Sequence, residues 1–162
     1  MARTPQLIVF DLDFTLWDCG GTWCDCLSPP FSGQGERVVD RDGRCIRLYE
    51  AVMPVLDHCD QQSIPMALAS RTEQPRWARQ LLALLGIAKR FQHSEIYPSS
   101  KLRHFEALHE ASSVTMDQMI FFDDEMRNIR EVGTLGVQCE FVEDGLTRSQ
   151  FEQALKTFAR PN

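Results

Sequence analysis

Five short apolar runs, each ending in polar residues, alternate along the chain with segments of helical periodicity. The runs occupy residues 6–12, 65–70, 94–97, 119–124 and 137–142. Short runs without polar alternation are typical of parallel strands that are buried on both faces. The helical segments occupy about 53–62, 74–85, 101–111, 127–135 and a last stretch from 147. This alternation predicts an α/β fold with a doubly wound, Rossmann-like parallel sheet of five strands and helices on both faces.

One connection does not fit this alternation, because about forty residues separate the first predicted strand from the first helix. Residues 37–48 alternate apolar and polar positions around Asp42-Gly43, a dipeptide that favours a two-residue hairpin turn. We therefore expect a small β-hairpin flap within an insertion of about residues 18–50. In a doubly wound sheet this insertion would lie over the carboxyl ends of the strands, where ligands bind. The chain as a whole, residues 1–162, has the length of a single domain.

The charge and hydropathy of the chain narrow its expected partners. Asp and Glu number 23 against 17 Lys and Arg, a net charge of −6, and no dense basic cluster predicts nucleic-acid binding. The apolar runs are too short to predict a membrane span. The N-terminal residues lead directly into the first apolar run without a leader pattern, so we expect a cytoplasmic protein with free thiols.

Side chains with catalytic potential recur where the predicted strands end. They are Asp11 and Asp13 after the first strand, Ser70 and Arg71 after the second, Lys101 beyond the third, and Asp123 and Asp124 after the fourth. Because parallel strands share one carboxyl edge, we expect these side chains to converge. Close carboxylates repel one another by about 4 kcal/mol per pair at an effective dielectric constant of about 20, so a cation belongs among them. Oxygen ligands with open positions for water and phosphate favour Mg²⁺ as the cofactor.

Cysteine chemistry is the competing interpretation of the segment that follows the first strand. Cys19, Cys24 and Cys26 lack the spacing of paired zinc ligands, and no second pair follows them. A cysteine phosphatase would need an Arg at a fixed offset, and none is near. Four aromatic residues border the same segment, and they either pack in the core or flap or form a face for an aromatic or sugar leaving group. They are Phe14, Trp17, Trp23 and Phe31.

The four strand-end motifs resemble those of the haloacid dehalogenase superfamily in residue type and order. "VFDLDFT" resembles its first motif, "LASR" its second, Lys101 its third and "FFDDEMRN" its fourth. Within that superfamily, "DLDFTLW", "ASRT", "EIYPSSK" and "FFDDEMRNI" are similar to the small eukaryotic magnesium-dependent phosphatases. The departures from those relatives, at Phe14, Ser99, Met126 and residues 18–28, concern substrate preference more than the reaction.

The resemblance implies a Mg²⁺-dependent phosphomonoester hydrolase that works through an aspartyl-phosphate. Asp11 would be the nucleophile, and Asp13 would protonate the leaving group and then activate water. The Asp11 carboxylate, the Asp13 backbone carbonyl and the Asp124 carboxylate would hold Mg²⁺. Asp123 would support these ligands or contact the metal weakly, with Asn128 as a further partner.

The resemblance also assigns the groups that bind the phosphate. Thr15, Ser70 and backbone amides near Leu12 and Asp13 would grip its oxygens. Lys101 would bridge Asp11 and the phosphate, and Arg71 would touch the substrate.

The expected partner is a phosphate monoester, either protein phosphotyrosine or a small phosphosugar or sugar-phosphate adduct, bound by a monomer. The alternative is a phospho-accepting signalling module or a non-catalytic phosphate-binding module on the same fold. Signalling receivers are phosphorylated on an Asp after the third strand, whereas "EIYPSSK" has none. The intact set of acids, Lys and Ser favours turnover over simple binding.

Overall fold

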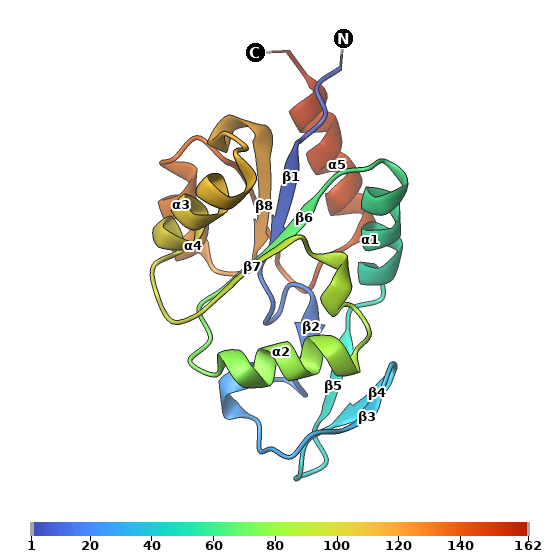
Figure 1. Cartoon of the computed structure of the whole chain (residues 1–162). Coiled ribbons are helices and arrows are strands. Elements are labelled where there is room, and N and C mark those ends of the chain that lie inside the picture. Colours follow the sequence, from blue (N-terminus) through green and yellow to red (C-terminus); the bar gives the residue numbers. More distant parts are fainter. Residues whose placement is uncertain (1, 162) are drawn as a thin grey trace.

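A computed structural model describes residues 2–161 and has a five-stranded parallel sheet at its centre, in the order β7-β6-β1-β8-β9 (Figure 1). The strands are β1 (Leu7–Phe10), β6 (Met66–Ser70), β7 (His93–Ile96), β8 (Met119–Asp123) and β9 (Gln138–Phe141). Phe10 pairs with Leu68 on one side and with Phe122 on the other, so three strands end at one level. This arrangement confirms the predicted doubly wound sheet. The first strand ends two residues before its predicted end, because the chain turns away after Asp11.

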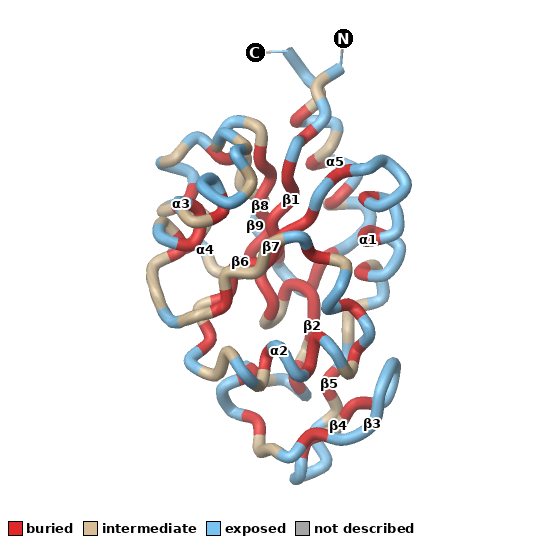
Figure 2. The backbone as a smooth tube through the Cα atoms, in the orientation of Figure 1, coloured by how far each residue is buried: buried red, intermediate tan, exposed pale blue. Residues whose placement is uncertain are grey.

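Helices cover both faces of the sheet, as predicted. They are α1 (Val52–Gln61), α2 (Pro75–Leu84), α3 (Lys101–Ser112), α4 (Met126–Gly133) and α5 (Arg148–Ala159), with short 3₁₀ turns η1 (Cys24–Cys26), η2 (Ala88–Arg90) and η3 (Met116–Gln118). Ile8 and Phe10 of β1 pack in the core with residues of α1, α2 and α5. Leu7 and Val9 point to the other face and pack with residues of α3 and α4. Figure 2 shows the resulting buried centre.

The strand order reverses at β1, because the chain first builds outward through β6 to β7 and then returns to β8 and β9. Such a reversal leaves a crevice at the carboxyl ends of the central strands, where doubly wound folds bind ligands. Within residues 2–161, no helix combines the length and the apolar character needed to cross a membrane.

The insertion after β1 forms a second, antiparallel sheet of four strands, which is larger than the predicted hairpin. Its order is β2 (Trp17–Asp18), β5 (Cys45–Leu48), β4 (Arg37–Val39) and β3 (Ser32–Gln34). The predicted pairing of β4 with β5 is present, with Val39 opposite Cys45. The turn has three residues and not two, because the Asp40 N–H donates to the Arg44 carbonyl at 3.0 Å. Gly43 adopts the left-handed φ of +85° that this turn requires.

Three contacts hold this flap in place. The buried Asp40 carboxylate accepts the backbone N–H of Ser28 at 2.9 Å and so ties the loop before β3 to the turn after β4. The Gly35 N–H at the other turn donates to the carbonyl of Leu84, the last residue of α2, at 2.8 Å. Next to it, the Phe31 ring packs edge-to-face on Trp77 of α2. The flap is therefore anchored to a helix of the core.

Candidate active site

The loop after β1 makes a tight turn that exposes two carboxylates at the carboxyl edge of the sheet. The Leu12 carbonyl accepts the N–H groups of Thr15, Leu16 and Trp17 at 2.9–3.2 Å. Phe14 adopts a φ of 60°, which is rare for an aromatic residue and lets the chain reverse within this turn. Within residues 2–161, the backbone N–H groups of Leu12 and Asp13 donate to no acceptor. They remain free to bind an anion beside Asp11.

Asp11 lies between a buried cation and a buried hydroxyl. Lys101 Nζ lies 2.8 Å from Asp11 Oδ1, and the Thr15 hydroxyl donates to Asp11 Oδ2 at 3.2 Å. Lys101 is the first residue of α3, is 1% exposed, and also contacts Asp123 Oδ2 at 2.5 Å. Burial works against its charge, but the two carboxylates outweigh burial and raise the pKa of Lys101. Lys101 is therefore a permanent cation that orients Asp11.

Asp11, Asp123 and Asp124 form a compact acidic cluster, each offering a carboxylate oxygen within 4.8 Å of the others. Burial and the charge of Asp11 raise the pKa of Asp124 and of Asp123, although Lys101 acts in the opposite direction on Asp123. These raised pKa values reflect the burial of the carboxyl groups and their closeness to one another. Hard oxygen donors at this separation fit Mg²⁺.

The two adjacent acids of β8 have different surroundings. Asp123 is fully buried, and its oxygens accept the Glu125 N–H at 2.7 Å and Asn128 Nδ2 at 3.1 Å, besides Lys101. Asp124 instead lines the cavity at the carboxyl edge. Asp124 is therefore the acid of this pair that faces the space for a ligand.

The second carboxylate of the β1 loop, Asp13, is hydrogen-bonded through one oxygen. Asp13 Oδ1 accepts the Trp17 indole N–H at 2.7 Å, the Cys24 backbone N–H at 3.0 Å and the Cys19 thiol at 3.7 Å. Burial raises the pKa of Asp13 to about 6, although the Trp17 and Cys24 hydrogen bonds oppose the shift. A carboxyl group with this pKa can both donate and accept a proton near neutral pH. Asp13 Oδ2 is the oxygen left for that exchange.

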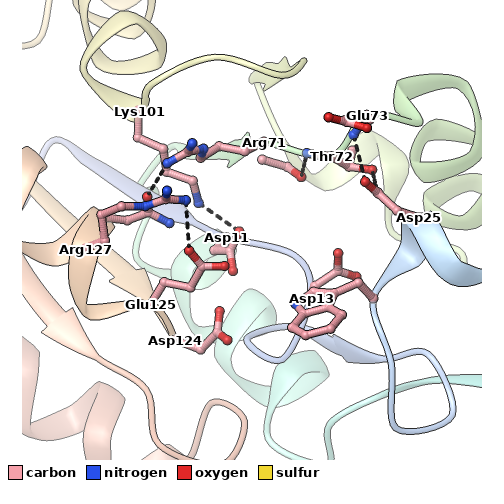
Figure 3. A pocket seen from close by; sticks show the side chains of 13 residues that line it. Asp11, Asp13, Asp25, Arg71, Thr72, Glu73, Lys101, Asp124, Glu125 and Arg127 are labelled. Atoms are coloured by element: carbon pink, nitrogen blue, oxygen red, sulfur yellow. Dashed lines mark hydrogen bonds and ion pairs between the residues drawn. The ribbon is translucent and has the colours of Figure 1, made fainter.

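These groups surround one cavity of about 240 Å³ (Figure 3). Ser70 and Arg71 reach it from the end of β6, and Arg71 donates to Asn128 Oδ1 at 3.2 Å. Ser70 Oγ accepts the Thr72 N–H at 3.3 Å, which leaves its hydroxyl proton for a ligand. The cavity thus brings Asp11, Asp13, Ser70, Arg71, Lys101, Asp124 and Asn128 together. Thr15 is fully buried and does not line it, so its hydroxyl orients Asp11.

Several contacts in the site were not predicted from the sequence. Trp17 was expected either to pack or to form a face for the leaving group, and it is fully buried, yet its indole N–H donates to Asp13. Asp25 accepts the Thr72 hydroxyl and, at 3.2 Å, the Glu73 N–H. No local pattern signals the bonds of Asp25, because Thr72 and Glu73 lie far from it in sequence. Proximity of Trp17 to the "DLD" motif was the one available hint.

Three of the cysteines, Cys19, Cys24 and Cys59, are buried in the core. All six are free, and within residues 2–161 none of them belongs to a cluster of three possible metal ligands. Cys19 and Cys24 are buried, and burial raises the pKa of both thiols, so neither is present as a reactive thiolate. Both residues contact Asp13 Oδ1, Cys19 through its thiol and Cys24 through its backbone N–H.

Solved structures define the class of fold to which this site belongs. A haloacid dehalogenase superfamily hydrolase from Ehrlichia chaffeensis superposes with a TM-score of 0.68, at 13% identity, over 98% of each chain. The N-terminal part of a Bacteroides fragilis protein, containing a phosphatase domain complexed with Mg, gives a TM-score of 0.64 at 15% identity. That match covers 96% of this chain and 40% of the other. The fold is that of the haloacid dehalogenase hydrolases.

Sequence comparison then identifies the family. Residues 3–161 match the family model described as Acid Phosphatase, and the chain belongs to this family. It is 45% identical to magnesium-dependent phosphatase 1 of Homo sapiens over 99% of this chain and 90% of the relative. A haloacid dehalogenase-like hydrolase superfamily protein of Schizosaccharomyces pombe is 34% identical, over 82% of this chain and 83% of the relative.

Proposed function

We propose that the protein is a Mg²⁺-dependent phosphatase that hydrolyses phosphate monoesters through an aspartyl-phosphate on Asp11. The observation that carries this proposal is that two carboxylates with different surroundings line one cavity. Asp11 is fixed by Lys101 and Thr15, and Asp13 has a pKa raised to about 6. The family and the magnesium-dependent relative support the same reaction class.

Residues around the acidic cluster provide a place for the metal ion. The carboxylates of Asp11 and Asp124 and the backbone carbonyl of Asp13 would hold Mg²⁺. Asp123 lies behind these ligands, where its carboxylate accepts hydrogen bonds from Lys101 and Asn128. When bound, Mg²⁺ would add to the positive charge of Lys101 and stabilise the negative charge on the phosphate oxygens.

The two carboxylates divide the chemistry. Asp11 attacks phosphorus and forms a P–O bond, while the bond to the leaving oxygen breaks and Asp13 gives that oxygen its proton. In the second step Asp13 takes a proton from water, the water oxygen bonds to phosphorus, and the Asp11–phosphorus bond breaks. Lys101, the Ser70 hydroxyl and the free N–H groups of Leu12 and Asp13 bind phosphate oxygens.

The substrate is a phosphate monoester, and two kinds suit the cavity: protein phosphotyrosine and small phosphosugars or their adducts. Arg71 stands at the cavity wall, where it would contact such a substrate. The presence of Asp13 favours a phosphatase over a phospho-accepting or purely phosphate-binding module. Asp13 would activate the water that hydrolyses the aspartyl-phosphate, so the phosphoryl group would not stay on Asp11. We further propose that residues 1–162 act as a single domain, with the insertion at about 18–50 as its flap, and as a cytoplasmic monomer.

Release of inorganic phosphate from p-nitrophenyl phosphate tests this function. We expect release with Mg²⁺, none after EDTA, and a fall in kcat of at least about 10³-fold for Asp11→Asn, which loses the nucleophile. Asp57→Asn is the matched control, since Asp57 lies exposed on α1 and should leave kcat unchanged. Full activity of Asp11→Asn would overturn the mechanism. A panel of phosphotyrosine peptides and phosphosugars, compared by kcat/KM, identifies the substrate.

A further inference from the structure

Trp23 is an exposed aromatic side chain at the active-site cavity. Four large apolar side chains are exposed within residues 2–161: Trp23, Met53, Met126 and Phe141. Of these, Trp23 is 53% exposed and lines the cavity that contains Asp11 and Asp13. An indole left half in solvent beside catalytic carboxylates is not accounted for by packing of the flap, where Phe31 is buried and Tyr49 packs against the core.

The position of Trp23 relative to Asp13 is fixed by local contacts. Its ring packs edge-to-face on Phe14 with centroids 5.7 Å apart, and Phe14 directly follows Asp13. The next residue, Cys24, donates its N–H to Asp13 Oδ1 at 3.0 Å. The Trp23 carbonyl accepts the Cys26 N–H at 2.9 Å, which closes the short turn η1. The indole is therefore held beside Asp13.

A clamp fastens the same turn to the loop that follows β6. The Asp25 carboxylate accepts the Thr72 hydroxyl through one oxygen and the Glu73 N–H through the other, at 3.2 Å. Figure 3 shows this clamp beside Asp13, with Arg71 and Arg127 across the cavity. The wall that carries Trp23 is thus formed by an aromatic face and by acids, and the cations lie on the other side.

Resting on the phosphatase function proposed above, we propose that Trp23 is a specificity-determining residue that contacts the leaving group. The leaving oxygen must reach Asp13 to take its proton, so the group attached to that oxygen lies against Trp23. Because this wall has no cation, contact there is apolar, and it favours leaving groups with a flat apolar face. Asp25 is the positioning residue that holds this wall.

Two substrates that differ in this face test the proposal: phenyl phosphate, which has an aromatic leaving group, and ethyl phosphate, which has none. Trp23→Ala lowers kcat/KM for phenyl phosphate by about tenfold and affects ethyl phosphate far less, because the lost contact is with the ring. Trp23→Phe retains most of the activity on phenyl phosphate. Phe141→Ala is the matched control, an exposed aromatic at the end of β9 outside the cavity, and leaves both substrates unchanged.

The role of Asp25 has its own readout. Asp25→Ala opens the clamp and lowers the preference for phenyl over ethyl phosphate. In the double variant Asp25→Ala/Trp23→Ala, the preference for phenyl phosphate falls no further than in Trp23→Ala alone. Both changes remove the same contact with the leaving group, so their effects do not add.

The outcomes separate this proposal from the proposed function. Equal losses on both substrates in Trp23→Ala would assign Trp23 to supporting Asp13 and overturn the proposal. No change in either kcat/KM value would also overturn it, while leaving the phosphatase function intact. Absence of phosphate release from either substrate by the unmodified protein would overturn the phosphatase function itself.

Discussion

Lys101 is the residue on which the electrostatics of the site depend. Its buried Nζ lies 2.8 Å from Asp11 Oδ1 and 2.5 Å from Asp123 Oδ2. Without Lys101, these two carboxylates would face each other with no cation between them. Removing one member of a buried ionic cluster leaves uncompensated charge, which costs far more than the loss of a surface ion pair.

Lys101→Met therefore lowers the free energy of unfolding by about 3 kcal/mol, measured by urea denaturation in EDTA so that no metal replaces the lost charge. It also lowers kcat, because Asp11 loses the group that orients it. Lys89→Met is the control at an exposed position of η2 and changes stability by less than about 0.5 kcal/mol. A Lys101→Met protein as stable as the unmodified one would contradict the proposed network.

His104 gives the protein a pH-dependent stability apart from the carboxylates. The side chain is fully buried in α3, with Nε2 3.0 Å from the Tyr97 carbonyl and, within residues 2–161, no partner for Nδ1. Burial lowers the pKa of His104 to about 4, and the charges of Lys101 and Arg71 act in the same direction. The neutral imidazole is therefore the folded form near neutral pH.

The sign of the effect follows from where the proton binds. Below pH 6.5 the unfolded chain protonates His104, whereas the folded protein does so only near pH 4. Stability is thus lost as the pH falls through this window, by about 3 kcal/mol between pH 7 and pH 4. His104→Gln keeps a donor toward Tyr97 without titrating, so its urea unfolding curves should lack this contribution. Equal pH dependence in both proteins would refute the assignment.

Among the elements, the flap depends on one buried carboxylate. Asp40 accepts the backbone N–H groups of Ser28, Asp42 and Arg44 at 2.8–3.0 Å. Burial opposes ionisation, but these hydrogen bonds, joined by the Arg44 guanidinium, lower the pKa of Asp40. A single side chain therefore organises the turn after β4 and the loop before β3.

Asp40→Ala leaves these backbone N–H groups without their acceptor and lowers the free energy of unfolding by about 2 kcal/mol. Asp42→Ala is the matched control in the same turn, because its side chain is 52% exposed and pairs with Arg44 only at 3.6 Å. Its effect on urea denaturation should stay below about 0.5 kcal/mol. Comparable stability of the two variants would show that Asp40 does not organise the flap.

The elements also differ in how far the sequence predicts them. The β4–β5 hairpin was predicted because its alternation and its Gly43 are local signals. Strands β2 and β3 were not, because two or three residues show no periodicity and Ser32–Gln34 is polar and exposed. The position of Trp23 follows from contacts with Phe14 and from the Asp25 clamp, and the sequence does not encode these at short range.

For the whole molecule, the fold follows from the pattern of apolar runs. The active site, in contrast, forms only when side chains from the ends of several strands meet. Parallel strands that end at one level bring Asp11, Ser70, Lys101 and Asp124 to one cavity from four parts of the chain. The positions of these residues at or beyond the ends of the predicted parallel strands predicted this convergence. The contact of Lys101 with Asp11 was predicted, whereas the hydrogen bonds that Asp13 accepts from Trp17 and Cys24 were not.

The central claim is that Asp11 carries the phosphoryl group and that Asp13 is needed to remove it. Asp13→Asn tests this directly with p-nitrophenyl phosphate, whose good leaving group departs without a proton donor. We expect rapid release of one nitrophenol per chain and a phosphoryl group trapped on Asp11, located by mass spectrometry of the acid-quenched protein. A phosphoryl group on another residue, or nitrophenol release matched throughout by free phosphate with no labelled protein, would contradict the account.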